Sequence, residues 1–406
     1  MKHLLIVTST FPVSDDDPVP AFVKDQLIAL KQQYPELKIS VLAPHDKRSN
    51  TKRITHHEHY DEYRFHYFWP YAAEKLAGRG IMPALKTNPL NYFLIPFLFL
   101  GEFVAAWSLT RRLKPNVIYA HWFTPQAIIA RFVGFLTRTP FVFTTHAADV
   151  DVWHKLPVIG NQVVRSNANK AHAITAVSRR SMAKLERFFT PTQWQALRSR
   201  TQIIPMGVTL PQVESTVSTT TKSIVFVGRL AEKKGVQYLL PAFAAARDQL
   251  PDYTLVIAGD GPWLPRLQKQ VTKLGLGEQV SFPGFVSGQQ KADLLSSADI
   301  YVVPSIITSS GDAEGLPVSL MEGLAYGKIC IATNESGADD ILTNGQDGFL
   351  LPQKDVNALA NALVTAAGMP ADDRRVMSEQ ARTTAQQFSW PTIAQRHYEF
   401  LFKDLI

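Results

Sequence analysis

The sequence contains only one cysteine, Cys330, among its 406 residues. An intramolecular disulfide needs two cysteines, so none can form. Cys330 lies in an apolar run, where we expect a buried thiol and a reducing compartment. Hydrophobic residues make up 46% and charged residues only 19% of the chain, a composition that excludes an extended disordered polymer. The length predicts two domains, each able to bury its own core.

Long hydrophobic runs are also lacking. Residues 4–7 are too few for the apolar region of a signal peptide and predict a buried strand instead. Residues 92–107 are the one candidate for a membrane span, but Pro96, Gly101 and Glu102 interrupt them, whereas a span needs about 20 consecutive apolar residues. We expect a core or interfacial helix here, with a spanning helix as the alternative, in a cytoplasmic protein.

Charge is distributed unevenly along the chain. Residues 1–200 hold 26 lysines and arginines against 14 acidic residues, while residues 201–406 hold 16 against 21. Ten of the eleven histidines also lie in the first half. A basic half predicts an anionic partner, such as a membrane surface or a phosphorylated substrate. Nucleic acid is not expected, because no aromatic-interleaved basic stretch or known binding motif is present.

Short apolar runs alternate with longer helical patterns, which predicts parallel sheets with helices on both faces. The expected strands form two series: Leu4–Val7, Ile39–Leu42, Val117–Tyr119, Phe141–Thr144 and Ala173–Val177, then Ile224–Val227, Thr254–Ala258, Val280–Phe282, Ile300–Val303 and Ile329–Thr333. Residues 209–222, rich in serine and threonine, predict a linker. We therefore predict an α/β protein with two Rossmann-like doubly wound domains, residues 1–208 and 223–387, facing a central cleft.

Glycine-bearing loops follow three strands of the second series. Residues 228–235 carry Arg229 and Lys234 just before a helix, residues 259–262 form a tight turn, and residues 304–305 lead into a third helix start. Glycine permits close backbone approach, and cations at a helix N-terminus suit a diphosphate. Solvated surface cations are the alternative, which leaves the flanking glycines unexplained. The loops together predict an anion site.

Two glutamates flank a predicted helix start in residues 311–327. Glu314 precedes Pro317, and Glu322 lies roughly one and a half turns into the helix. Because apolar residues flank Glu322, we expect its carboxylate to be largely buried and to need a polar partner. The alternative is a turn acid favoured by the helix dipole, together with one solvated glutamate.

Four motifs occur in a fixed order, namely Val227–Gly235, Ala258–Pro262, Val303–Ser305 and Glu314–Glu322. Together they resemble glycosyltransferase family 4, retaining enzymes of GT-B fold whose signature is a pair of glutamates with seven residues between them. Gly345–Leu350 resembles the strand and turn that follow in that family. Residues 388–406 resemble its C-terminal segment, which would cross back to the first domain. The N-terminal half resembles the family more loosely.

The resemblance implies a role for each matched residue. The catalytic residues would be His121 and Glu314. The residues expected to contact the donor sugar are Glu314, Gly315, Leu316 and His146. The residues expected to contact the diphosphate are Gly228, Arg229, Lys234 and Leu316. The nucleoside would contact Glu322, through its ribose hydroxyls, and Gly259. No metal or other cofactor is expected, because the cations and the helix N-terminus would hold the diphosphate.

The sequence departs from the family pattern at several points, among them Met206-Gly207 in place of the usual Asn-Gly before the linker. The loop after the first strand, Asp17–Phe22, lacks the usual glycine, and Pro20 would narrow the approach of a diphosphate. Asp340 stands where a glutamate is often found, which suggests a different donor sugar. Pro241 within the helix after Gly235 predicts a bend there.

Other groupings indicate less. His56–His59 contains three histidines but lacks the paired spacing of a metal site. Asp149-Val-Asp151 has the form of the metal–diphosphate motif of the other major glycosyltransferase fold, and we interpret the match as accidental because it continues the His146 loop. Asp15–Asp17 predicts a solvated loop.

The predicted function is retaining transfer of a sugar from a UDP- or GDP-linked donor to a saccharide or lipid-linked saccharide, in surface polysaccharide biosynthesis. The basic first half would hold the acceptor and contact an anionic membrane peripherally. The alternatives are a nucleotide-sugar 2-epimerase of the same fold, a catalytically silent sugar-nucleotide-binding partner protein and a hinged solute-binding protein. The spacing of the two glutamates is that of the transferases and not of the epimerase. A silent partner protein would be expected to lose these site residues, and a solute-binding protein would need a signal for export.

Overall fold

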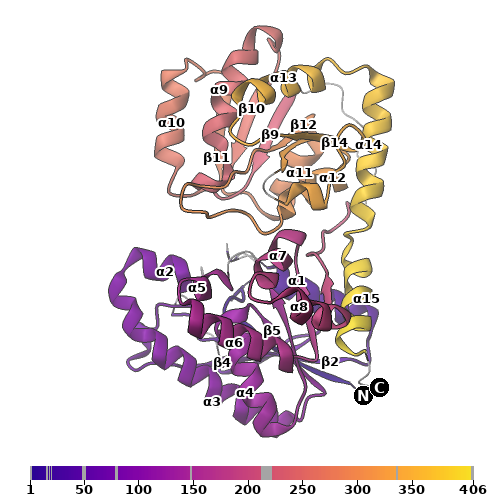
Figure 1. Ribbon diagram of the computed structural model, residues 1–406. Helices are drawn as coiled ribbons and strands as arrows, with labels where there is room; N and C mark the ends of the chain where they lie inside the picture. The colour runs from indigo at the N-terminus through magenta and orange to yellow at the C-terminus, as the bar shows by residue number, and fades with distance from the viewer. Residues whose placement is uncertain are drawn as a thin grey trace. The chain divides into compact units, whose positions relative to one another are not determined.

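The computed structural model describes residues 2–14, 17, 19, 21–47, 52–77, 81–146, 149–211, 222–334 and 337–403. The chain forms two compact units (Figure 1), the first of Met1–Gly207 with Trp390–Ile406 and the second of Val208–Ser389. Most of the linker predicted at 209–222 lies outside the described residues.

The first unit contains an eight-stranded sheet in the order β3-β4-β2-β1-β5-β6-β7-β8. All neighbouring strands are parallel except β3 and β4, which are antiparallel. The strands are β1 (His3–Val7), β2 (Lys38–Pro44), β3 (Ile54–His56), β4 (Asp61–Phe65), β5 (Val117–His121), β6 (Phe141–Thr145), β7 (Ala173–Ala176) and β8 (Thr201–Ile203). The sheet order reverses at β1, between β2 and β5, as in a doubly wound fold.

Helices cover both faces of this sheet. They are α1 (Phe22–Gln33), α2 (Ile81–Thr87), η2 (Pro89–Leu94), α3 (Ile95–Leu113), α4 (Ile128–Thr137), α5 (Asp151–His154), α6 (Pro157–Lys170), α7 (Arg179–Glu186), α8 (Pro191–Leu197) and α15 (Trp390–Leu401). Residues 92–107, the sequence's candidate span, therefore lie within η2 and α3.

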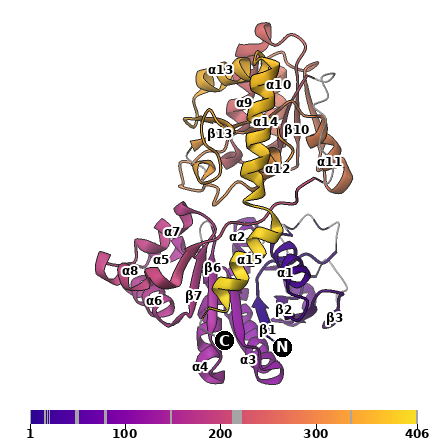
Figure 2. The same cartoon turned by 90° about the vertical axis from the view of Figure 1, so that its right-hand side faces the viewer.

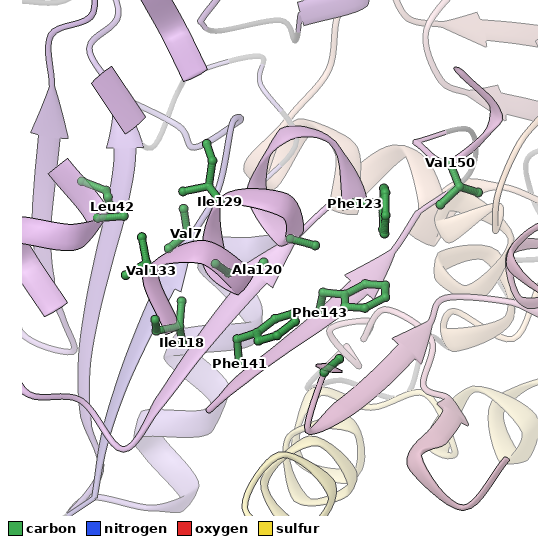
Figure 3. Packing of buried hydrophobic residues seen from close by; sticks show 14 of the residues in the cluster. Val7, Leu42, Ile118, Ala120, Phe123, Ile129, Val133, Phe141, Phe143 and Val150 are labelled. Carbon is green, nitrogen blue, oxygen red and sulfur yellow. The ribbon is translucent and has the colours of Figure 1, made fainter. Parts of the chain in front are cut away.

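The core of the first unit explains why its central strands read as continuous apolar runs. Successive side chains of a strand point to opposite faces. Leu5 and Val7 pack on one face of β1 with α3 and α4, whereas Leu4 and Ile6 pack on the other with α1 and α15. Figure 3 shows the hydrophobic cluster on the Val7 face of the sheet, between the sheet and α4. Both faces are buried, so no polar alternation appears in the sequence.

The second unit contains a six-stranded, wholly parallel sheet in the order β11-β10-β9-β12-β13-β14. The strands are β9 (Ser223–Val227), β10 (Thr254–Ala258), β11 (Val280–Gly284), β12 (Ile300–Val303), β13 (Ile329–Thr333) and β14 (Gly348–Leu351). Its helices are α9 (Val236–Ala246), α10 (Leu264–Lys273), α11 (Gly288–Ser297), α12 (Val318–Ala325), α13 (Val356–Ala367) and α14 (Ala371–Gln386). Pro241 lies inside α9, as the sequence predicts.

The C-terminal helix α15 packs on the first unit, beside α1 (Figure 2). The ring of Tyr398 stacks on that of Tyr34 with centroids 3.6 Å apart. Gly207 faces the indole of Trp390 so closely that a Cβ on residue 207 would lie 2.3 Å from the ring. A larger residue at 207 would therefore displace the start of α15.

All ten predicted strands are present, and the predicted α/β class with two Rossmann-like doubly wound sheets is confirmed. The sequence did not predict β3, β4 and β8. β4 carries charged side chains, and β3 and β8 have only three residues each, so none has an apolar run that could signal it.

Candidate active site

In the second unit, the loop that follows β9 packs against the loop that follows β12. The backbone N–H of Ile306 donates to the carbonyl of Lys233 over 2.8 Å. Gly235 has φ of +71°, and a Cβ there would lie 1.7 Å from the carbonyl oxygen of Pro304. Only glycine fits such a contact. The contact between these two loops is therefore a fixed feature of the unit.

Glu314 lies in the loop before α12, as predicted, and pairs with two lysines of the β9 loop. Lys234 Nζ donates to Oε2 of Glu314 over 3.1 Å, and Lys233 Nζ lies 3.7 Å from Oε1. Lys233 also donates to Asp312 over 3.3 Å. The Glu314 side chain is 13% exposed. The carboxylate predicted to contact a sugar and the lysine predicted to contact a diphosphate are thus direct neighbours.

The charge state of Glu314 follows from this pairing. Burial alone would raise the pKa of its carboxyl, because desolvation disfavours the charged form, but the charges of Lys234 and Lys233 and their hydrogen bonds lower it further than burial raises it. The resulting pKa lies below the ordinary glutamate value. Glu314 is therefore ionised at neutral pH.

Glu322 lies on α12 and is largely, though not fully, buried, as the sequence predicts. Its side chain is 21% exposed, and Lys291 of α11 donates to Oε1 over 2.5 Å. Oε2 has no hydrogen-bond partner among the described residues. The polar partner that the sequence analysis required is therefore Lys291. No sequence signal identifies it, because it comes from another helix, 31 residues earlier.

The remaining predicted donor residues lie around the same loops. Gly259 has φ of +143°, and a Cβ there would lie 1.9 Å from the carbonyl oxygen of Gly228. Gly315 and Leu316 are buried between Glu314 and α12. Arg229 is exposed, and no ion pair is found for it within the part of the chain that the structure describes. It is free to meet an anion.

In the first unit, two predicted histidines lie at the ends of adjacent strands. His121 is the last residue of β5, which runs two residues further than the predicted strand Val117–Tyr119, and is fully buried. His146 follows β6, and its Nε2 lies 3.4 Å from Nδ1 of His121. The rings of Trp122 and Phe22 lie 4.8 and 5.4 Å from that of His146. Trp122 has φ of +74°, a strained conformation for a non-glycine residue.

Both histidines are neutral at physiological pH. Burial lowers the pKa of His146 to about 3. Burial, then the nearby charges of His146 and His397 when these are protonated, hold the pKa of His121 well below its usual range. Nε2 of His121 has no hydrogen-bond partner among the described residues. His121 can therefore form a hydrogen bond with a ligand, but it cannot act as a general acid near pH 7.

Asp149 holds the two histidine loops together. Its carboxylate accepts from the backbone N–H of Phe123 at 2.7 Å, the backbone N–H of His146 at 3.2 Å and the hydroxyl of Thr145 at 2.7 Å. Burial nevertheless raises its pKa to about 6. Asp151 instead pairs with Lys184 at 2.6 Å. The two carboxylates serve different contacts, which supports the interpretation of Asp149-Val-Asp151 as an accidental match.

A polar layer beneath His121 escaped the sequence analysis. The hydroxyl of Tyr119 lies 2.5 Å from that of Thr144, which lies 2.5 Å from that of Thr175. His397 of α15 is buried beside Tyr119, with ring centroids 6.0 Å apart, and neither ring nitrogen has a partner among the described residues. Burial lowers its pKa to about 3. Its position on an ordinary amphipathic helix gave no signal.

The other groupings noted in the sequence do not form a site. His56 pairs with Asp61 at 2.6 Å and His57 with Glu62 at 2.9 Å, so these histidines do not converge. Asp340 lies in a short 3₁₀ turn, Ala338–Asp340. Pro20 and two residues of Asp15–Asp17 lie outside the described residues, so the prediction about that loop stays a prediction.

Comparisons with known proteins bear on both units. The family described as Glycosyl transferases group 1 matches residues 212–384, and the Glycosyl transferase 4-like domain matches residues 32–202. The chain is 33% identical over 159 residues to a putative colanic acid biosynthesis glycosyltransferase, WcaL, of Escherichia coli, a stretch that spans 39% of each chain. It is 27% identical to a GDP-mannose-dependent phosphatidylinositol monomannoside mannosyltransferase of Mycolicibacterium smegmatis, over 75% of this chain and 81% of the relative.

Solved structures share the fold over the whole chain. Sucrose-phosphate synthase from Thermosynechococcus elongatus superimposes with a TM-score of 0.74 at 20% identity, over 100% of this chain and 99% of that one. Anabaena HepE in complex with UDP superimposes with a TM-score of 0.70 at 19% identity, over 99% of each chain. With the two family matches covering one unit each, this chain belongs to the group 1 glycosyltransferases, family 4, and has the GT-B fold.

Proposed function

We propose that the protein transfers a sugar from a UDP- or GDP-linked donor to a saccharide or lipid-linked saccharide, with retention of configuration, in polysaccharide biosynthesis. The observation that carries the proposal is the contact of Glu314 with Lys234 and Lys233 between two glycine-bearing loops. Relatives named for colanic acid, amylovoran and mannoside synthesis support the acceptor class.

The nucleotide would bind along the carboxyl ends of the second sheet. Gly259 lets its loop pack directly against the carbonyl of Gly228, and exposed Arg229 and the two lysines offer positive charge to a diphosphate. Glu322, held by Lys291, would accept from the ribose hydroxyls through its second oxygen. One relative is named for GDP-mannose and one neighbour was solved with UDP, so both bases remain candidates.

The chemistry would proceed by front-face attack within an ion pair. The bond from the anomeric carbon to the diphosphate breaks, the acceptor oxygen bonds to the same face of that carbon, and its proton passes to the departing phosphate oxygen. Lys234 and Arg229 would stabilise the negative charge that develops on the diphosphate in the transition state. Electrostatic stabilisation of this kind is usually the largest single contribution to an enzyme's rate enhancement. Ionised Glu314 would stabilise the cationic sugar, and neutral His121 would contribute a hydrogen bond. No metal is required in this scheme.

The experiment is donor turnover without acceptor. The purified protein is incubated with UDP-, GDP- and ADP-sugars, and free nucleoside diphosphate and sugar are quantified beside Glu314→Ala and Lys234→Ala. Slow hydrolysis of one donor that both variants lose supports the proposal. Conversion of the donor to an isomer would replace it with the epimerase, and no turnover together with no thermal stabilisation by any nucleotide would overturn it.

We further propose that an anionic membrane surface is the partner of the first unit, through a surface made by η2, α3 and α4. Helix Pro89–Leu113 is the one described segment long and apolar enough to cross a membrane, and only 33% of its most apolar window is buried. Leu98, Ala106 and Leu109 face the core. The opposite face exposes the apolar side chains Phe93, Phe97, Leu100 and Val104.

Charge on this surface favours anionic lipid. α4 lies beside α3 (Figures 1 and 2) and exposes Phe132, Phe135 and Leu136. Residues 89–140 carry five basic residues, Arg111, Arg112, Lys114, Arg131 and Arg138. Their single acid, Glu102, is buried, and burial raises its pKa to about 8, so it is neutral at pH 7. Apolar side chains rimmed by cations match the interfacial region of a bilayer.

Vesicle co-sedimentation tests this surface. Binding to phosphatidylglycerol vesicles at low salt should fall strongly in Arg111→Gln/Arg112→Gln and in Leu100→Gln/Phe135→Gln, and the first loss should be the more salt-sensitive. Lys269→Gln/Lys273→Gln, on the exposed face of α10, is the matched control. Equal binding by all variants would remove the membrane proposal and leave the transferase proposal untouched.

A further inference from the structure

A second histidine and carboxylate cluster lies in the first unit, apart from His121 and His146. His45 directly follows β2 and His66 directly follows β4. These strands are parallel neighbours, with Pro44 paired to Phe65 and the backbone N–H of His45 donating to the carbonyl of Phe65 over 2.8 Å. The topology therefore brings the two imidazoles to one point at the carboxyl edge of the sheet.

Glu74 completes the cluster. Oε2 lies 2.6 Å from Nδ1 of His45 and 3.0 Å from Nδ1 of His66. One ligand atom from each of the three residues can be chosen so that all lie within 4.8 Å of one another, and no other such group of three occurs in the part of the chain described here. Both imidazoles thus contact the same carboxylate oxygen.

The surroundings fix the carboxylate. The Glu74 side chain has no exposed surface. Its other oxygen, Oε1, accepts from the backbone N–H groups of Tyr67 at 2.5 Å and Phe68 at 3.0 Å. Hydrogen bonds of this kind orient a ligating carboxylate in metal sites. Tyr71 stacks on the ring of His66 with centroids 3.7 Å apart and fixes that ring as well.

The donor set suits zinc. Two imidazoles and one carboxylate form a common zinc ligand set, with bond lengths of about 2.0–2.2 Å. Tetrahedral ligands at that distance lie about 3.3 Å from one another, so the present separations of 2.6 and 3.0 Å need to open by about 0.7 and about 0.3 Å. Each ring would coordinate through Nδ1 after its proton moves to Nε2. His66 is 33% exposed, which leaves access for the ion.

We propose that His45, His66 and Glu74 form a binding site for a divalent transition metal of the zinc class. The ion joins the ends of β2 and β4 to the segment of residues 66–76 that begins the connection to α2. Its role is to stabilise this edge of the first unit, and sugar transfer does not pass through it. The site goes beyond the proposed transferase activity and does not depend on it.

The matched contrast is the pair His56 and His57. Both also meet carboxylates, at 2.6 and 2.9 Å, but each meets a different one and His56 is 75% exposed. A chain that binds zinc through any accessible histidine would lose as much from His56→Asn/His57→Asn as from His45→Asn/His66→Asn. A built site loses zinc only in the second variant. Glu74→Gln is less informative, because the buried carboxylate also holds the backbone.

The test uses the full chain, stripped with a chelator and dialysed against Zn²⁺. Bound metal is measured by elemental analysis, and Co²⁺ is added separately to record its visible absorption. We expect about one zinc per chain, a rise in the unfolding temperature with Zn²⁺, and at least a tenfold weaker affinity in His45→Asn/His66→Asn, since even loss of an outer contact weakens metal sites 10–100-fold. Unchanged zinc content in that variant, or equal loss in His56→Asn/His57→Asn, would overturn the proposal.

Discussion

The two candidate site regions both lie at the ends of strands of a parallel sheet, but their side chains differ in charge. At the ends of β5 and β6, His121 and His146 are buried and uncharged, and Asp149 holds their loops by hydrogen bonds. In the second unit, Glu314, Lys233 and Lys234 are partly exposed and charged. Burial removes charge in the first region, while opposite charges preserve it in the second. The first region is suited to hydrogen bonding and the second to stabilising charge.

The largest expected effect is on catalysis at the charged region. Glu314→Gln keeps the side-chain volume but removes the negative charge beside the reacting sugar, so kcat should fall by about 100-fold or more, as when other preorganised electrostatic contacts are removed. Steady-state kinetics with the donor found in the turnover panel measures this. Glu232→Gln, which changes a glutamate of the β9 loop next to Lys233, is the control. A kcat for Glu314→Gln within threefold of wild type would contradict the assignment.

The second effect is on the stability of the charged region. Gly235→Ala forces a Cβ to 1.7 Å from the carbonyl of Pro304 at φ of +71°, whereas Gly275→Ala has a similar φ of +66° and nothing within 4 Å. We expect Gly235→Ala to lower the free energy of unfolding by about 3 kcal/mol or more and Gly275→Ala by about 1 kcal/mol. Denaturant unfolding monitored by circular dichroism compares them. Equal losses would mean that the loop contact is not fixed.

The third effect tests the uncharged region by pH. Burial lowers the pKa of His397 and His146 to about 3, while unfolded histidine titrates near 6.5. Below pH 6.5 only the unfolded state takes up these protons, so stability is present above that pH and is lost as pH falls towards 3.

His397→Leu removes one of these protons. As the pH falls from 6 to 4, the free energy of unfolding of the variant should therefore decrease less steeply than that of the wild type. The two slopes should differ by about 1.4 kcal/mol per pH unit, the contribution of one proton. Equilibrium unfolding at a series of pH values measures the slope. A slope unaffected by His397→Leu would show that the histidine is not neutral in the folded protein.

The smallest expected effect concerns Lys291. Because it is 32% exposed and only orients Glu322, Lys291→Gln should weaken nucleotide binding a few-fold, about 0.5–1 kcal/mol. Glu322→Gln should weaken it more, since it removes the acceptor itself. Competition binding with a fluorescent nucleotide separates the two. A larger loss for Lys291→Gln would mean that the lysine contacts the ligand directly.

The sequence predicted the strands, the loops that carry the donor residues and the position of Glu314 before α12, because local periodicity and glycine placement determine all three. It could not predict that Lys234 pairs with Glu314, which lies 80 residues further along the chain, or that Lys291 is the partner of Glu322. Nor could it find His45, His66 and Glu74, whose meeting depends on β4 lying beside β2. Contacts between segments far apart in sequence leave no mark on either segment.

Calorimetric titration of UDP and GDP into the wild-type protein and Lys234→Gln tests the central claim, that the charged region binds a nucleoside diphosphate. One of the two nucleotides should bind with a stoichiometry of one, and Lys234→Gln should weaken it at least about tenfold while Lys269→Gln/Lys273→Gln does not, since a charged hydrogen bond contributes about 1.5–3 kcal/mol. Binding of neither nucleotide, or equal affinity in wild type and Lys234→Gln, would contradict the account.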